Sequence, residues 1–426
     1  METATLIIVL VIAFALFFDF TNGFHDTANA MATPIATGAL KPKVAVLLAA
    51  ILNLVGAFLS TEVAKTISGG IIREEDISNA IFPEIIFAGL IGAITWNMIT
   101  WLLGLPSSSS HALFGGLIGA TIIGVGVAAI DFSVVVSKVI LPAVIAPLTA
   151  GIIAFTVTKI AYAVTRRYDS RPDGRDGFRV GQIFTSSLVA LAHGTNDAQK
   201  TMGIITLALL AVGWQTDPDP QTWVIFACAI TIALGTYMGG WRIIRTLGKG
   251  LTEVKPAQGF AAEASTASTI LASSALGFAL STTQVASGSV IGSGLGRRGS
   301  SVRWRTVGRI MIGWLLTLPA AGAVGAAAAL VVVIFNGMGL AWVGMLIDAA
   351  LALVVILGLF ARSRRNAVNA SNAMSEVAES GAAVKVKRNP PPTRRQRAIA
   401  REEARRVAAA EAAARRAAKK DPKGSR

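Results

Sequence analysis

Long apolar stretches recur along the chain as far as residue 360, and they constrain its fold more than any other feature. A helix needs about 20 apolar residues to cross a hydrocarbon layer about 30 Å thick. A segment in lipid must also satisfy its own backbone hydrogen bonds, so these stretches predict an all-α polytopic membrane protein. They cover residues 3–20, 44–60, 85–104, 138–162, 223–240, 310–335 and 341–360.

The composition agrees with this class, because 53% of the 426 residues are apolar and only 15% are charged. The first stretch has no basic flank and runs on into Asp19 without a small-residue cleavage site. We therefore expect it to be a membrane span rather than a secretory signal peptide.

Loop charges predict the orientation in the cell membrane. Basic loops at 41–43, 166–179, 242–255 and 297–309 alternate with acidic loops at 73–76 and 217–219. Lys and Arg remain on the cytoplasmic side, so the N-terminus is expected outside. The alternation predicts about eleven passages: five before the loop at residue 166, five after it, and a final span at 341–361 that leads into a cytoplasmic tail.

The tail at 362–426 holds most of the net charge of +15. From residue 361 onward there are 18 Lys and Arg against 6 Asp and Glu, so the tail carries 18 − 6 = +12 and the rest 15 − 12 = +3. A flexible basic tail next to a membrane is attracted to anionic lipid. No aromatic residue in the basic run offers a stacking surface for bases, so we expect no nucleic-acid partner.

An odd number of passages in each group of five predicts opposite orientations for the two groups. The groups are also related in sequence: residues 22–31 match 193–202 with Gly, Asp and Met coinciding (194 − 23 = 171), and 108–111 match 281–284 (281 − 108 = 173). Residues 1–165 and 180–335 are therefore expected to form an inverted-topology repeat, with broken helices and re-entrant hairpins, of the kind that builds secondary transporters.

Two aspartates occupy equivalent places in the repeated motifs, directly after apolar spans. A carboxylate at membrane depth costs about 2.5 to 3.5 kcal/mol on insertion scales, so it faces a partner or a wet cavity. The Gly, Asn and Thr residues around each Asp predict an interrupted helix, and histidine can carry protons near neutral pH. Cation or proton coupling is expected at Asp26, Asp197, His25, His193, Thr27, Gln199, Lys200 and Gln284.

Hydroxyl runs precede a glycine-bearing apolar stretch in each half. Ser and Thr are good helix N-caps, and the helix that follows presents free N–H groups and the positive end of its dipole to an anion. Two such helix starts related by inversion would converge on one tetrahedral oxyanion. Substrate binding is expected at Ser108, Ser109, Ser110, Ser281, Thr282 and Thr283, with Asn29 and Asn196. The sequence assigns no metal ligand set and no cofactor.

At these motifs the sequence resembles the PiT inorganic phosphate transporter family, in particular its bacterial low-affinity branch. The resemblance is carried by residues 20–30, 96–112 and 193–203 and extends over about residues 1 to 360. It implies an inverted-repeat symporter that forms a homodimer and holds phosphate between its halves. It also implies that bacterial members use protons, sometimes carrying phosphate as a metal complex, and that eukaryotic members use sodium. The chain departs from the family pattern at Ala279 and Gln284, where Pro and His are usual.

Energetics favours symport of phosphate, because moving one negative charge into an inside-negative cell costs about 2.3 kcal/mol per 100 mV. Co-transported protons are the expected compensation, with sodium as the alternative. Other readings are a permease for sulfate or another oxyanion, a membrane phosphohydrolase using His25 and Asp26 with a metal, and an interaction protein organised by the tail. The hydrolase reading lacks a clear nucleophile, so we expect a transporter and not an enzyme.

Overall fold

The structure, a computed structural model, describes residues 2–70, 72, 81–166, 176–365 and 367–373. In these residues the chain is helical apart from connecting segments and one isolated bridge between Ile72 and Ile130, which confirms the predicted all-α class. The α-helices are α1 (Glu2–Ala36), α2 (Pro42–Gly56), α3 (Glu62–Gly70), α5 (Phe82–Leu103), α6 (Ser109–Gly124), α7 (Phe132–Val134), α8 (Leu141–Arg166), α9 (Asp176–Ala211), α10 (Thr222–Met238), α11 (Trp241–Arg245), α12 (Pro256–Ala275), α13 (Thr282–Gly296), α14 (Trp304–Asn336) and α15 (Ala341–Arg364).

Five helical segments in the described residues are long and apolar enough to cross a membrane, or six if the bent pair α10 and α11 forms one span. Their outer faces suit lipid, since Leu148, Leu315 and Val354 are all more than half exposed. The count of about eleven passages stays a prediction, because it also includes helices that are shorter or more polar than these. The remaining helices are either short, such as α2, α6 and α13 with 15 or 16 residues, or too polar, such as α9 and α12.

The two aspartate motifs lie inside continuous helices, so the predicted interruptions in α1 and α9 are wrong. Thr27 Oγ1 donates to the Gly23 carbonyl 2.7 Å away, one turn earlier in the same helix, so its hydroxyl does not open the backbone. Gly23 instead permits close packing: a Cβ there would lie 2.4 Å from the Ile232 carbonyl oxygen of α10. Small residues in membrane helices commonly serve such contacts.

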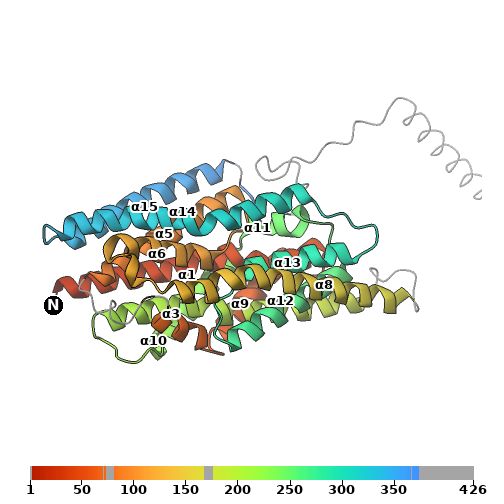
Figure 1. Ribbon diagram of the computed structural model, residues 1–426. Coiled ribbons are helices and arrows are strands. Elements are labelled where there is room, and N and C mark those ends of the chain that lie inside the picture. Colours follow the sequence, from red (N-terminus) through yellow and green to blue (C-terminus); the bar gives the residue numbers. More distant parts are fainter. Residues whose placement is uncertain (1, 71, 73–80, 167–175, 366, 374–426) are drawn as a thin grey trace, which may run out of the picture. The chain divides into compact units, whose positions relative to one another are not determined.

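Helices from the two halves of the chain exchange partners. α1 packs against α9 and α10, and α2 packs against the same two helices. α6 packs against α14, as the counterpart helix α13 packs against α8 (Figure 1). The contacts even match in detail, because Gly119 meets Gly322 while Gly292 meets Gly151. The pairs α1–α9, α1–α10, α6–α14 and α8–α13 therefore each join a helix of one half to a helix of the other.

Two helix–turn–helix units, α5–α6 and α12–α13, bring non-helical backbone into the protein interior. Residues 105–108 and 278–281 have no regular structure, and the helix after each begins at a buried residue, Ser109 or Thr282. Irregular backbone at membrane depth is tolerated where it is buried in protein or lines a cavity. These two units hold the hydroxyl runs.

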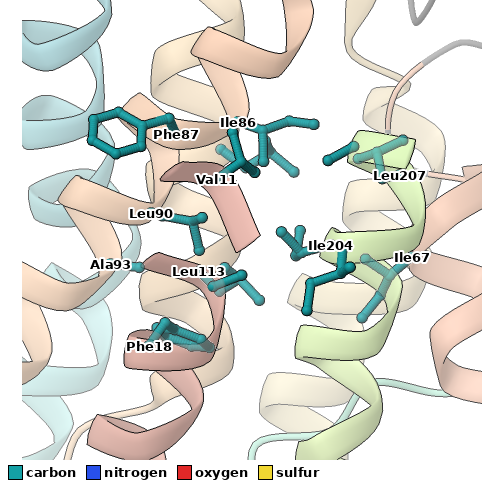
Figure 2. Packing of buried hydrophobic residues seen from close by; sticks show 14 of the residues in the cluster. Val11, Phe18, Ile67, Ile86, Phe87, Leu90, Ala93, Leu113, Ile204 and Leu207 are labelled. Atoms are coloured by element: carbon teal, nitrogen blue, oxygen red, sulfur yellow. The ribbon is translucent and has the colours of Figure 1, made fainter. Parts of the chain in front are cut away.

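A layer of apolar side chains covers the protein interior on the N-terminal side of Asp26. Figure 2 shows Phe18 of α1 near Leu90 of α5 and Leu113 of α6, with Ile204 of α9 in the same cluster. We call these four residues and their neighbours Val11, Ile67, Ala93 and Leu207 the apolar layer.

The end of α15 and the segment that follows it both contact α11. Arg242 Nη2 donates to the Ser363 carbonyl oxygen at 2.9 Å, and Arg245 Nε donates to that of Ala373 at 3.3 Å. The predicted final span 341–361 falls within α15. Most of the predicted basic tail, from residue 374 to 426, lies outside the described residues.

Candidate functional site

Asp26 of α1 and Asp197 of α9 meet in the interior. Both side chains are buried, with at most 1% of the residue exposed. One oxygen of each, together with a ring nitrogen of His193, lies within 4.8 Å of the others. Two carboxylates this close repel one another strongly unless a cation or proton lies between or beside them. The group is therefore a candidate cation site, with two oxygen donors and one nitrogen donor.

Hydroxyls from α6 and α13 converge on the same carboxylates. Ser109 Oγ donates to Asp26 Oδ2 at 2.7 Å, and Thr283 Oγ1 donates to Asp26 Oδ1 at 3.1 Å. Thr282 Oγ1 lies 3.0 Å from Asp197 Oδ2 and 3.5 Å from Asp26 Oδ2, so it bridges the two halves. A hydroxyl that donates to a carboxylate keeps its lone pairs, which suit a hard cation.

The N-caps that the sequence predicts explain why these hydroxyls point inward. Ser108 Oγ accepts from His111 N at 3.1 Å, and Ser281 Oγ accepts from Gln284 N at 3.3 Å. Each cap starts a helix, α6 or α13, whose next residue, Ser109 or Thr282, reaches the carboxylates. The N-terminal ends of both helices therefore face the site with their positive dipole ends. The predicted capping role of the hydroxyl runs is confirmed.

Basic side chains surround the carboxylates. His25 Nδ1 lies 2.7 Å from Asp26 Oδ1, and His193 Nε2 lies 2.8 Å from Asp197 Oδ2. Lys200, only 1% exposed, forms an ion pair with Asp197 and donates to the Leu280 carbonyl at 2.9 Å. With neutral histidines the site holds two negative charges and one positive charge, so it carries a net charge of −1.

Asn29 links the halves, since its Nδ2 donates to Thr283 Oγ1 at 3.0 Å and to Thr282 Oγ1 at 3.2 Å. Nine of the sequence-predicted residues thus form one connected cluster: Asp26, Asp197, His25, His193, Lys200, Asn29, Ser109, Thr282 and Thr283. Their four helices come from both halves of the chain.

Other predicted residues make their contacts elsewhere. Asn196 Nδ2 donates to Ser274 Oγ at 2.8 Å, and Gln199 Oε1 accepts from Val63 N at 2.7 Å, so both hold neighbouring helices in place. Ser110 Oγ donates to the Leu280 carbonyl at 3.1 Å. Gln284 Nε2 lies 3.3 Å from His111 Nδ1, which joins the starts of α6 and α13. Thr27 faces α10 through the Thr236 carbonyl.

Several neighbours of the site were not predicted from the sequence as site residues. The Leu280 carbonyl accepts from both Lys200 and Ser110, but a main-chain acceptor leaves no residue-type signal. His25 Nε2 lies 3.3 Å from Thr100 Oγ1, and His193 Nδ1 lies 3.2 Å from Asn53 Oδ1. Asn53, a polar residue inside the apolar stretch 44–60, is a candidate neighbour of the site from the sequence, and the structure places it beside His193.

The helical fold, the apolar spans and a buried charged cluster between two related sets of helices define a multi-pass membrane protein of the transporter class. Comparison with known proteins gives the family. Residues 22–325 match the model of the phosphate transporter family, and the chain belongs to that family. It is a transporter and not an enzyme, and inorganic phosphate is the substrate of this family.

Curated relatives agree with this placement. The chain is 54% identical over 374 residues to a probable low-affinity inorganic phosphate transporter of Mycobacterium bovis, covering 87% of this chain and 88% of that protein. It is 41% identical to a probable low-affinity inorganic phosphate transporter of Bacillus subtilis, covering 77% and 98%. A solved sodium-dependent phosphate transporter has a similar fold, with a TM-score of 0.62 and 23% identity over 76% of this chain and 98% of that one.

Proposed function

We propose that this protein is a symporter that imports inorganic phosphate together with cations, and that the cluster around Asp26 and Asp197 binds both. The observation that carries the proposal is the convergence of two buried carboxylates, a lysine and two helix N-termini from both halves of the chain. An anion alone would not be served by two carboxylates, and a cation alone would not need the helix N-termini and Lys200.

The charge of the site sets the order of binding. At a net charge of −1, a buried site repels phosphate, which itself carries one or two negative charges. One cation or proton at the carboxylates brings the site to neutrality, and a second makes it positive. We therefore expect cations to bind first and to raise the affinity for phosphate.

The phosphate would then lie against the starts of α6 and α13. Free N–H groups in the first turn of each helix and the dipole ends favour an anion there. Ser109, Thr282 and Thr283 lie at this point and donate to the carboxylates. When a cation takes over part of the carboxylate charge, the same hydroxyls can turn and donate to phosphate oxygens.

Protons are the coupling ion that the cluster supports best. Each carboxylate has its own histidine at 2.7 or 2.8 Å, so each half holds a His–Asp pair that can accept a proton. Sodium is the second candidate, because the carboxylates and hydroxyls also offer it oxygen ligands. A relative of similar fold is named as sodium-dependent. A neutral metal–phosphate complex as the transported species is a further version of the same mechanism.

The proposal includes an inverted repeat of residues 1–165 and 180–335, supported by the exchanged helix pairs and the matching glycine contacts. It also includes an N-terminus outside, a cytoplasmic tail, and a homodimer embedded in lipid. The orientation follows from the loop charges and the dimer from the family resemblance.

Phosphate uptake into liposomes, with sodium and proton gradients imposed separately, tests the proposal. We expect a proton gradient to drive uptake above its equilibrium level. If only the sodium gradient drives uptake, the coupling ion is sodium and not the proton. If neither gradient drives uptake, symport is refuted. Excess sulfate in the same assay should leave labelled phosphate uptake unchanged, whereas strong competition would favour a general oxyanion permease.

A further inference from the structure

A second carboxylate group lies two turns before Asp26 on the same helix. The spacing of Asp19, Asn22 and Asp26 by three and seven residues places all three along one side of α1. Asp19 is fully buried, and its Oδ1 accepts from Thr201 Oγ1 of α9 at 3.0 Å. Its Oδ2 has no hydrogen-bond partner within 3.5 Å among the described residues, although the main chain of Ile232 in α10 lies near the carboxyl group. The nearby Lys200 is paired with Asp197 instead.

Two buried amides accompany Asp19 at this level. Neither the oxygen nor the nitrogen of the Asn22 and Asn97 side chains finds a partner in the described part of the chain, although both residues are at most 1% exposed. Buried polar groups are normally satisfied, so several such atoms together indicate a ligand or water.

The register of α1 against α5 places these amides at the same level. The rings of Phe14 and Phe87 lie 4.7 Å apart, and His25 Nε2 lies 3.3 Å from Thr100 Oγ1. The residue numbers of the two contacting pairs differ by 87 − 14 = 73 and 100 − 25 = 75, so α1 and α5 run parallel. Asn22 and Asn97 differ by 97 − 22 = 75 and therefore lie level with one another.

We call Asp19, Asn22, Asn97 and Thr201 the polar group. On α1, α5 and α9 this group lies between the central site and the apolar layer. On α1, Asn22 and Asp19 lie between Asp26 and Phe18. On α5, Asn97 lies between Thr100 and Ala93 in the sequence, and on α9, Thr201 lies between Asp197 and Ile204. Along α1, Asp19 and Asn22 therefore lie nearer to the N-terminal end than Asp26 does, next to the apolar layer.

We propose that Asp19, Asn22 and Asn97 form a second binding site for a small hard cation, sodium or hydronium, on the outer approach to the central site. Asp19 supplies the charge, and the two amide oxygens and the Thr201 hydroxyl supply neutral oxygen ligands, the donor set that such cations prefer. A bound cation would also compensate a buried carboxylate that no basic group pairs with. The inference rests on the proposed symport, because the site loads the cation that accompanies phosphate.

Cation activation of phosphate uptake in liposomes tests this site. The half-activating sodium concentration is measured at fixed pH, and the half-activating proton concentration at fixed sodium, for the wild-type chain and for Asp19→Asn. We expect either the half-activating sodium concentration or the half-activating proton concentration to rise about tenfold or more in Asp19→Asn, because a charged ligand is lost. The affinity for phosphate, measured at a saturating cation concentration, should remain within about threefold of the wild type. Asn22→Leu and Asn97→Leu, which keep the branched shape of the side chain and remove its polar atoms, should shift the same ion in the same direction.

Asp348→Asn is the matched control. Asp348 is a buried aspartate of α15 that also has an oxygen without a partner among the described residues, but it is remote in sequence from the motifs of the central site. Unchanged cation dependence in Asp19→Asn, or an equal shift in Asp348→Asn, would overturn the second site. A wild-type chain that no cation activates would instead refute the symport proposal. Binding of ²²Na⁺ and uptake of protons by the purified protein then decide the second site on their own. If wild type and Asp19→Asn bind equal amounts of sodium and take up equal numbers of protons, the second site is overturned.

Discussion

Replacing Thr282 by valine should weaken phosphate and cation binding together. The substitution keeps the branched shape of the side chain and removes one hydroxyl. This hydroxyl lies 3.0 Å from Asp197 Oδ2 and 3.5 Å from Asp26 Oδ2, and it accepts a hydrogen bond from Asn29 at 3.2 Å. Thr282 is the residue whose hydroxyl contacts both carboxylates. Removing this hydroxyl leaves the buried Asp197 carboxylate with one fewer hydrogen-bond donor, and an uncompensated carboxylate charge is costly in a buried place.

A hydrogen bond to a charged group is worth about 1.5 to 3 kcal/mol. At about 1.4 kcal/mol per factor of ten, the affinity for phosphate should fall by about one to two orders of magnitude. Isothermal titration of phosphate into purified protein at fixed pH and sodium measures this directly. Ser109→Ala should behave alike, since Ser109 Oγ donates to Asp26 at 2.7 Å and the positions are equivalent (282 − 109 = 173).

Ser110→Ala is the matched control, because the Ser110 hydroxyl donates to the Leu280 carbonyl and to neither carboxylate. Its phosphate Kd should stay within about threefold of the wild type. If the hydroxyls only support helix packing, the variants would instead give less folded protein with an unchanged Kd. An unchanged Kd in both Thr282→Val and Ser109→Ala would remove the hydroxyls from the binding site.

Three further outcomes are expected. Asp26→Asn and Asp197→Asn should each abolish cation-driven uptake while the purified protein remains folded, which uptake and circular dichroism measure side by side; near-normal uptake in either would contradict the paired site. Deleting residues 374–426 should leave the phosphate Kd unchanged, and a tenfold rise would place the tail in the transport cycle. Gly288→Ala should lower thermal stability by ~1 to 3 kcal/mol, because its Cβ would lie 2.3 Å from the Pro147 carbonyl oxygen; an unchanged melting temperature would refute this packing.

Residue type and spacing were enough to predict nine of the side chains that meet at the centre. Asp26 and Asp197 could be paired because the same motif occurs twice, and the hydroxyl runs could be read as helix N-caps. Both expectations depend on local chemistry that a sequence shows directly: a charge inside an apolar stretch, and Ser or Thr before a helix.

The backbone around the aspartates could not be predicted in the same way. Gly23 suggests a break when it is read alone, but its neighbour is the Ile232 carbonyl of α10, more than 200 residues away in the sequence. Only the packed structure shows that glycine is needed there for close approach in an unbroken helix.

The roles of Gln199 and Asn196 were also beyond the sequence. Each sits beside Asp197 or within two residues of it, yet successive helical residues point in different directions, and these two side chains hold α3 and the α12–α13 turn. Conversely, Asp19 gave no repeat signal, because no carboxylate stands at the equivalent place in the second half (19 + 171 = 190, an alanine).

Thermodynamic linkage between cation and phosphate tests the central claim most directly. The Kd of phosphate for the purified protein is measured by titration at increasing sodium concentration at fixed pH, and at decreasing pH without sodium. If the carboxylates of Asp26 and Asp197 must be compensated before phosphate binds, the Kd falls by about tenfold or more as one of these cations saturates, and Asp197→Asn weakens this dependence. A Kd that stays constant across both series would contradict a shared site for cation and phosphate.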